Sequence, residues 1–217
     1  MTAALEDREG FAAFLLRMRA RGIADKPLLA AIEAIPRRAF VPAQWHAAAW
    51  SERMIPIDCG ETLEGLDLQA LAVSSLQLGP GQRVLEIGTG SGYTAALMAR
   101  LGPRVVSLER YRRLIDHARQ RLDALGLTNV VLRQADGAKG PPGEGPFDRI
   151  MCWAAFPELP RHFVDHLTSG GVMVAPVGPG DGEQDMIRLT KLGSRFERED
   201  LAKVRLQPLA QGVTSAI

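Results

Sequence analysis

The stretch Val84-Leu85-Glu86-Ile87-Gly88-Thr89-Gly90-Ser91-Gly92 decides the fold of this chain. Its first residues are largely apolar, as in a buried strand, and glycine then occupies every second position. Glycine has no Cβ, so the backbone can turn sharply there and approach a ligand closely. Residues 93–100 follow with a helical pattern. The sequence therefore predicts a ligand site at a helix N-terminus, outside the carboxyl end of a strand.

The glycine spacing distinguishes two classes of cofactor. Dinucleotide sites usually have the spacing G-x-G-x-x-G, whereas this chain has G-x-G-x-G followed by Tyr93. The carboxylate of Glu86, just before the glycines, is expected to face the ligand. A negative charge is unfavourable beside a pyrophosphate and attractive beside the ammonium or sulfonium group of S-adenosylmethionine (SAM). The stretch therefore resembles the first motif of class I SAM-dependent methyltransferases. The expected cofactor loop consists of Gly88, Thr89, Gly90, Ser91 and Gly92.

Two more acidic residues follow the next two apolar runs. Glu109 ends the run 104–108, about twenty residues beyond the loop, a spacing that suits a carboxylate on both ribose hydroxyls. Asp136 follows the run 129–134 and is expected to accept from the adenine amino group, while the backbone N–H of Gly137 meets a ring nitrogen. A single acid at a strand end is more often a solvated carboxylate. Three acids at the ends of three successive strands favour a SAM site.

Length and composition are typical of one compact enzyme. The chain has 217 residues, of which 46% are hydrophobic, and a formal net charge of +1, so no nucleic-acid partner is expected. The pairs Arg37-Arg38 and Arg112-Arg113 are interpreted as solvated helix faces. No long apolar run and no basic leader occur, so neither a membrane partner nor secretion is expected. Cys59 and Cys152 lack metal-binding spacing, and reduced thiols in a cytoplasmic protein are the expectation.

The chain divides into a helical N-terminal extension, residues 1–80, and a SAM-binding core, residues 81–217, within one compact unit. From residue 83 to about 176, strands alternate with helices. This alternation predicts an α/β fold, with a mostly parallel, Rossmann-like sheet flanked by helices. Expected helices of the extension cover residues 11–18, 27–35 and 67–76.

The second half of the core is expected to complete the sheet. A fourth strand covers residues 145–155, and a helix then runs to Leu167 and is capped by Gly170-Gly171. A fifth strand covers residues 172–178. The expected final, antiparallel pair consists of residues 186–191 and 204–209.

Short motifs over most of the chain carry a more specific resemblance. They are Arg38-Ala39-Phe40-Val41-Pro42, Ile55-Pro56-Ile57, the glycine loop with Tyr93, Ser107-Leu108-Glu109-Arg110, Ala135-Asp136-Gly137, Phe147-Asp148-Arg149-Ile150, Pro157-Glu158-Leu159-Pro160, Pro176-Val177-Gly178 and Phe196-Glu197-Arg198-Glu199-Asp200-Leu201. In this order they resemble the protein-L-isoaspartate O-methyltransferase family. The resemblance implies that SAM is converted to S-adenosylhomocysteine. It also implies that the methyl acceptor is the carboxylate of an isomerised aspartyl residue in a protein or peptide, and that Arg110 belongs to the cofactor site.

The chain departs from the family pattern where substrate chemistry is expected. The family has a segment G-x-T-[IL]-S-x-P, whose hydroxyl residue is associated with the isoaspartyl carboxylate. This chain reads Gly60-Glu61-Thr62-Leu63-Glu64-Gly65-Leu66, so Glu64 replaces the serine and Leu66 the proline. Trp153 and Gln207 are further departures. Thr62 and Glu64 are the candidate catalytic residues.

The replacement by Glu64 leaves several interpretations open. An ionised glutamate donates no hydrogen bond and repels a second carboxylate in the same pocket. Glu64 either turns outward, as a plain surface carboxylate, with Thr62 or a backbone N–H holding the acceptor carboxylate, or it serves an amine or hydroxyl acceptor as base or anchor. A SAM-binding protein with little catalytic activity is the third interpretation. The sequence leaves the oligomeric state open.

No metal site is expected. His162 and His166 lie four residues apart on an expected helix, a spacing that can bind a metal ion. No third ligand accompanies them in the sequence, so a solvated helix face is the preferred interpretation.

Overall fold

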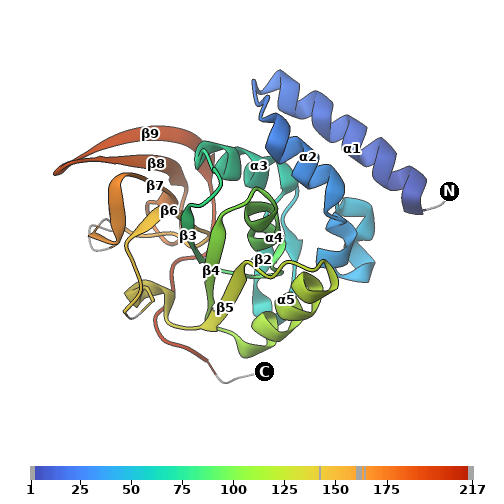
Figure 1. Ribbon diagram of the computed structural model, residues 1–217. Coiled ribbons are helices and arrows are strands. Elements are labelled where there is room, and N and C mark those ends of the chain that lie inside the picture. The colour runs from blue at the N-terminus through green and yellow to red at the C-terminus, as the bar shows by residue number, and fades with distance from the viewer. Residues whose placement is uncertain (1–2, 142, 160–162, 164, 215–217) are drawn as a thin grey trace.

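A computed structural model describes residues 3–141, 143–159, 163 and 165–214 of the chain. Within these residues, one sheet has the strand order β5-β4-β3-β6-β7-β8-β9. Its strands are β3 (Arg83–Ile87), β4 (Arg104–Glu109), β5 (Val130–Gln134), β6 (Phe147–Cys152), β7 (Leu167–Val177), β8 (Gln184–Leu192) and β9 (Arg195–Val204). The α-helices are α1 (Ala3–Ala20), α2 (Lys26–Ala34), α3 (Leu66–Ser75), α4 (Tyr93–Arg100) and α5 (Arg112–Ala124). Helices α3, α4 and α5 lie on one side of the sheet (Figure 1).

The sheet has the expected mostly parallel arrangement. Strands β5, β4, β3, β6 and β7 pair in parallel, and β8 and β9 extend the sheet in antiparallel fashion. The chain runs outward from β3 through β4 to β5 and then continues with β6 on the other side of β3. Such a reversal of strand order leaves a crevice beyond the carboxyl end of the central strand. The glycine loop, residues 88–92, lies at this point.

The conformation at the start of α4 explains why the last residue of the loop is glycine. Gly92 precedes the helix with φ of 86°, in the left-handed region that glycine adopts most readily. A Cβ on Gly92 would lie only 2.9 Å from the Cβ of Ala118 on α5. Gly92 therefore permits the close packing of α4 against α5.

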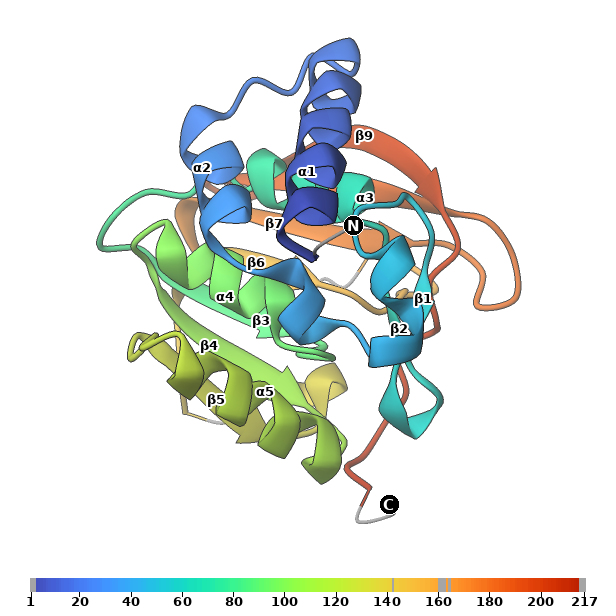
Figure 2. The ribbon, with the colours of Figure 1, turned by 90° about the vertical axis from the view of Figure 1, so that its right-hand side faces the viewer.

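The N-terminal extension shares a hydrophobic core with the sheet. Buried side chains of α1 and α2, among them Phe14 and Leu28, belong to the same cluster as Leu97 of α4. Arg17 of α1 also forms a bidentate pair with Asp67 of α3, with Nη2–Oδ1 and Nε–Oδ2 distances of 2.9 Å. Figure 2 shows α1, α2 and α3 together above the helices that cover β3 and β4. These contacts join the extension to the sheet.

Short elements connect α2 to α3 in the extension. They are the 3₁₀ helices η1 (Arg37–Phe40), η2 (Ala43–Ala48) and η3 (Asp58–Gly60), and the small antiparallel pair β1 (Ile55–Pro56) and β2 (Thr62–Leu63). The 3₁₀ helix η4 (Gly137–Lys139) follows β5 in the core. Only Glu64 and Gly65 separate β2 from α3, so these two residues are held between two ordered elements.

Two expectations about the last strands are wrong. Gly170-Gly171 lie inside β7, which starts at Leu167, and do not cap a helix. A register shift between Phe147 and Arg149 of β6 lies opposite, and glycine is tolerated at such an irregularity. The final strand is β9, not residues 204–209, because Gly193 at φ 61° supports a two-residue hairpin turn between β8 and β9.

The structural findings on metal ions and membrane helices concern the described part of the chain only. There, no group of three or more His, Cys, Asp or Glu residues is arranged to hold a metal ion. His162 and much of the expected helix before Leu167 lie outside the described residues. No helix within the described ranges is long and apolar enough to cross a bilayer.

Candidate functional site

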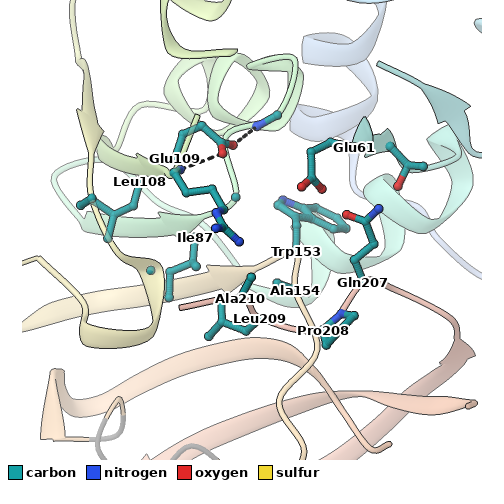
Figure 3. Close-up of a pocket in the computed structure, with 16 residues that line it drawn as sticks. Glu61, Ile87, Leu108, Glu109, Trp153, Ala154, Gln207, Pro208, Leu209 and Ala210 are labelled. Atoms are coloured by element: carbon teal, nitrogen blue, oxygen red, sulfur yellow. Dashed lines mark hydrogen bonds between the residues drawn. The ribbon is translucent and has the colours of Figure 1, made fainter. Parts of the chain in front are cut away.

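Two adjoining pockets lie at the carboxyl ends of β3, β4 and β6. Pocket A is lined by Glu61, Thr62, Ile87, Gly88, Gly90, Leu108, Glu109, Arg110, Ala135, Gly137, Trp153, Ala154 and the segment 207–210. Pocket B is lined by Glu61, Thr62, Leu63, Glu64, Gln69, Gly88, Thr89, Gly90, Ser91, Tyr93, Thr94, Trp153 and Gln207. Figure 3 shows pocket A. The two pockets share the glycine loop, so a ligand in one lies next to a ligand in the other.

The glycine loop is shaped for close approach. Gly88 and Gly90 have φ of 93° and 51°. A Cβ on Gly88 would lie 3.2 Å from the Cβ of Trp153. The backbone N–H of Gly88 donates to the carbonyl of Leu108 at 2.9 Å, which ties the loop to β4. Side chains at these positions would both strain the backbone and fill the pocket.

Glu109 lies at the wall of pocket A and is held by backbone donors. Its Oε2 accepts from the N–H of Gly90 at 2.9 Å, and its Oε1 accepts from the N–H groups of Arg110 and Tyr111 at 2.8 and 3.1 Å. Burial raises the pKa of Glu109, and the three backbone donors oppose that rise. The carboxylate is thereby held in one orientation at the edge of the pocket, as expected for a group that accepts from ribose hydroxyls.

Glu86 lies beneath the loop instead of facing the ligand. It is fully buried, and its carboxylate accepts from the hydroxyls of Thr94 and Ser107 and, at 3.3 Å, from the indole N–H of Trp153. Burial raises its pKa to about 7. Glu86 is not among the described residues that line either pocket. Ser107 also contacts the hydroxyl of Thr89 at 2.6 Å, so Glu86 supports the loop from behind.

The two residues after β5 have different positions. Asp136 caps η4 by accepting from the N–H of Ala138 at 3.0 Å, and it is not among the described lining residues of pocket A. Gly137 does line the pocket, and a Cβ there would lie 2.6 Å from Cγ2 of Ile87. Arg110 lines the same pocket, and its Nε is buried without a hydrogen-bond partner among the described residues.

Glu64 faces pocket B. It is 7% exposed, and its Oε1 accepts from the hydroxyl of Thr62 at 3.4 Å. Burial raises the pKa of Glu64 to about 7. The interpretation in which Glu64 turns outward as a surface carboxylate is therefore wrong. Ser91, in the same pocket, has a buried hydroxyl without a partner among the described residues.

The family departures meet in space. Glu64, Trp153 and Gln207 all line pocket B, although they lie far apart in the sequence. Gln207 donates to the carbonyl of Gly60 at 3.1 Å and so connects the C-terminal segment to the residues before Glu64. In the view of Figure 3, the indole of Trp153 lies between Glu109 and Gln207. Trp153 and Gln207 also line pocket A, whereas Glu64 lines pocket B alone.

Two residues at pocket B were not predicted from the sequence: Gln69, which lines the pocket, and Arg37, which contacts two of its lining residues. Arg37 was expected on a solvated face, yet it is 1% exposed and donates to the carbonyl of Glu64 at 2.8 Å. Gln69 is 3% exposed and lines the pocket from α3. The apolar residues after Arg38 could have indicated a buried neighbour, whereas no spacing pattern marks Gln69.

Comparison with known proteins shows the family of the chain. The family model described as protein-L-isoaspartate(D-aspartate) O-methyltransferase matches residues 11–214. The chain belongs to this family. A relative from Rhizobium meliloti (strain 1021), named protein-L-isoaspartate O-methyltransferase, is 46% identical over 200 residues, which cover 92% of this chain and 98% of the relative.

Solved structures resemble the fold. One titled protein-L-isoaspartate O-methyltransferase has a TM-score of 0.79 at 26% identity and covers 95% of this chain and 67% of its own. A structure of a Plasmodium falciparum protein in complex with S-adenosyl-L-homocysteine has a TM-score of 0.77 at 23% identity, and covers 91% of this chain and 97% of its own. The second likeness concerns the fold alone.

Proposed function

We propose that the protein transfers the methyl group of SAM to the free α-carboxylate of an isoaspartyl residue in a protein or peptide. Family membership supports the reaction class. The observation that carries the proposal is the junction of the two pockets at the glycine loop, with Glu109 on one side, Glu64 on the other and Thr62 in the wall of both. A donor and an acceptor bound on the two sides of this loop lie next to each other.

The residues of pocket A fit SAM. Glu109 is oriented to accept from the ribose hydroxyls, and Gly88 and Gly90 leave room that a Cβ would occupy. The unpartnered Nε of Arg110 is buried in the wall of pocket A, where a polar ligand would satisfy it. SAM supplies a methyl group that its positively charged sulfur already activates.

The remaining cofactor assignments are part of the same proposal. Thr89, Gly92, Arg110 and Gly137 contribute to the loop or to the pocket wall, and Asp136 shapes the turn that carries Gly137. Glu86 acts through Ser107 and Thr89, not by direct contact. We thus assign the cofactor side to the core, residues 81–217, and much of the acceptor side to the extension, residues 1–80.

The chemistry of the acceptor requires positioning more than proton transfer. A carboxylate is already ionised near neutral pH and needs only to be held in line with the methyl carbon. Thr62 donates its hydroxyl proton to Oε1 of Glu64, and Glu64 in its neutral form donates an O–H to the acceptor carboxylate. An ionised Glu64 would repel the acceptor. The raised pKa of Glu64, about 7, keeps a large neutral fraction available at neutral pH.

The proposal is tested with two peptides of one sequence, one with isoaspartate and one with aspartate, and SAM labelled at the methyl group. We expect label to enter the isoaspartyl peptide alone, as an ester that mild base hydrolyses. Base-stable label on an amine, or no label with either peptide although SAM binds, would contradict the proposal.

A cytoplasmic location belongs to the proposal as well, supported by free thiols at Cys59 and Cys152.

A further inference from the structure

A buried arginine without a carboxylate partner lies behind pocket B. Arg37 forms no ion pair with any described carboxylate, and its donors go to neutral oxygens. Nε donates to the carbonyl of Ala49 at 2.6 Å, Nη1 to Oε1 of Gln69 at 2.6 Å, and Nη2 to the carbonyl of Glu64 at 2.8 Å. A guanidinium stays charged at neutral pH, and a buried charge without a counter-ion is costly. A bound anion nearby would offset part of that cost.

Arg37 determines which way the amide of Gln69 points. A guanidinium only donates, so the atom that faces Arg37 must be the amide oxygen. The amide nitrogen is then on the other side of the same carbon. It makes no hydrogen bond within the described part of the chain, and it is not one of the fully enclosed atoms without a partner. Since Gln69 lines pocket B, this N–H group is the donor that it offers to a ligand there.

We propose that Gln69, oriented and polarised by Arg37, donates its amide N–H to the acceptor carboxylate in pocket B. The inference rests on the proposed function, because it takes a carboxylate acceptor as the ligand. The cation on Oε1 draws electron density from the amide and strengthens its N–H as a donor. Gln69 is then a binding residue of the acceptor site, and Arg37 is a positioning residue that acts through it.

Burial favours the neutral form of the two carboxyl groups that line pocket B. Glu61 and Glu64 both line the pocket, and burial raises the pKa of each. A neutral carboxyl group is a donor, so protonated Glu64 and Gln69 would hold the acceptor carboxylate together. An amide does not titrate, so the contribution of Gln69 persists at pH values where Glu64 is ionised.

The substitution Gln69→Glu tests the inference with little change of shape. The new carboxylate keeps an oxygen on Arg37, now in an ion pair, but it has no N–H to offer to the pocket. Gln120→Glu, the same change at an exposed position of α5, is the matched control. Isoaspartyl peptide is titrated by calorimetry into each protein saturated with S-adenosylhomocysteine, and KM, kcat and the melting temperature are measured alongside.

We expect Gln69→Glu to weaken peptide binding and to raise KM about tenfold or more, the loss of one hydrogen bond to a charged group. S-adenosylhomocysteine affinity and the melting temperature should stay close to those of the parent and of Gln120→Glu. Gln69→Met, which is neutral, should show the same loss of peptide binding, so the effect does not depend on added charge.

Two results would overturn the inference about Gln69, and a third would contradict the proposed function. Parental peptide affinity in Gln69→Glu would overturn the inference and leave the proposed function intact. A parallel loss of S-adenosylhomocysteine affinity or of melting temperature would show a merely structural role and would also overturn it. A parent protein that neither binds nor methylates the isoaspartyl peptide would instead contradict the proposed function itself.

Discussion

The backbone N–H of Gly90 donates a hydrogen bond to Oε2 of Glu109 at 2.9 Å. Gly90 follows β3 and Glu109 ends β4, and the parallel pairing of these strands brings their carboxyl ends to one edge. The bond therefore couples the shape of the glycine loop to the carboxylate that we propose to accept hydrogen bonds from the ribose hydroxyls of SAM.

Replacing Glu109 by glutamine should weaken cofactor binding. An amide nitrogen in place of one oxygen would face a backbone N–H, so at least one of the charge-assisted hydrogen bonds is lost. We expect the Kd of S-adenosylhomocysteine, measured by calorimetry, to rise about tenfold or more. Glu197→Gln, an exposed position of β9, is the control and should not change the Kd. An unchanged Kd in Glu109→Gln would show that this carboxylate does not bind the cofactor.

Replacing Gly92 by alanine should destabilise the protein. Its φ of 86° strains any other residue, and the new Cβ would lie 2.9 Å from the Cβ of Ala118. We expect a loss of about 2–4 kcal/mol in the free energy of unfolding, measured by urea denaturation. Gly126→Ala is the control for strain alone, since Gly126 has φ of 65° but open space around it. Adding Ala118→Gly to Gly92→Ala should restore the part of the free energy of unfolding that is lost through the clash.

The affinity for the acceptor should depend on pH through Glu64. Its pKa of about 7 leaves the group neutral, and able to donate, below that pH and ionised above it. The KM for isoaspartyl peptide should therefore rise as pH increases from about 6 to about 8.5, since the acceptor is ionised throughout. Glu64→Gln donates at every pH and should give a flatter KM profile. Glu61→Gln serves as comparison, and an unchanged profile in Glu64→Gln would refute the role of Glu64.

Burial of Glu86 should make stability depend on pH. Its pKa is about 7 in the folded protein, whereas an unfolded chain has the ordinary value near 4.5. Between these values the folded state binds more protons, so the free energy of unfolding should fall as pH rises from about 4.5 to about 7 and then level off. Urea denaturation at about pH 5.5 and about pH 8.5 measures the difference. Glu86→Gln should reduce it by an amount on the order of a few kcal/mol, and Glu197→Gln should not.

The sequence predicted much of the fold because the parallel core has strong local patterns. The apolar runs before Gly88, Glu109 and Asp136 correspond to β3, β4 and β5. The helices after the glycine loop and at residues 26–34 also formed as expected, the latter with Asp25 accepting from the N–H of Leu28 at 3.0 Å. The last strand was misplaced, because antiparallel pairing there depends on the turn at Gly193 more than on apolar alternation.

Individual site residues were harder to predict. Glu86 and Glu109 look alike in the sequence, since each is an acid at the end of an apolar run. In the structure, hydroxyl and indole donors surround Glu86 beneath the loop, and backbone donors hold Glu109 at the pocket wall. Gln69 and Arg37 carry no motif at all. Their roles arise from a contact between residues 32 positions apart.

The sequence by itself determined the α/β fold, the position of the glycine loop and the place where the chain leaves its family's pattern. These features are local, because strand propensity, glycine spacing and a substituted residue are all visible in a few consecutive positions. Only the tertiary structure decided that Glu64 faces the pocket, that Glu86 lies behind the loop and that Arg37 orients Gln69. Burial and hydrogen-bond partners depend on segments that meet only when the chain has folded, and these determine which carboxylates and amides can act on a ligand.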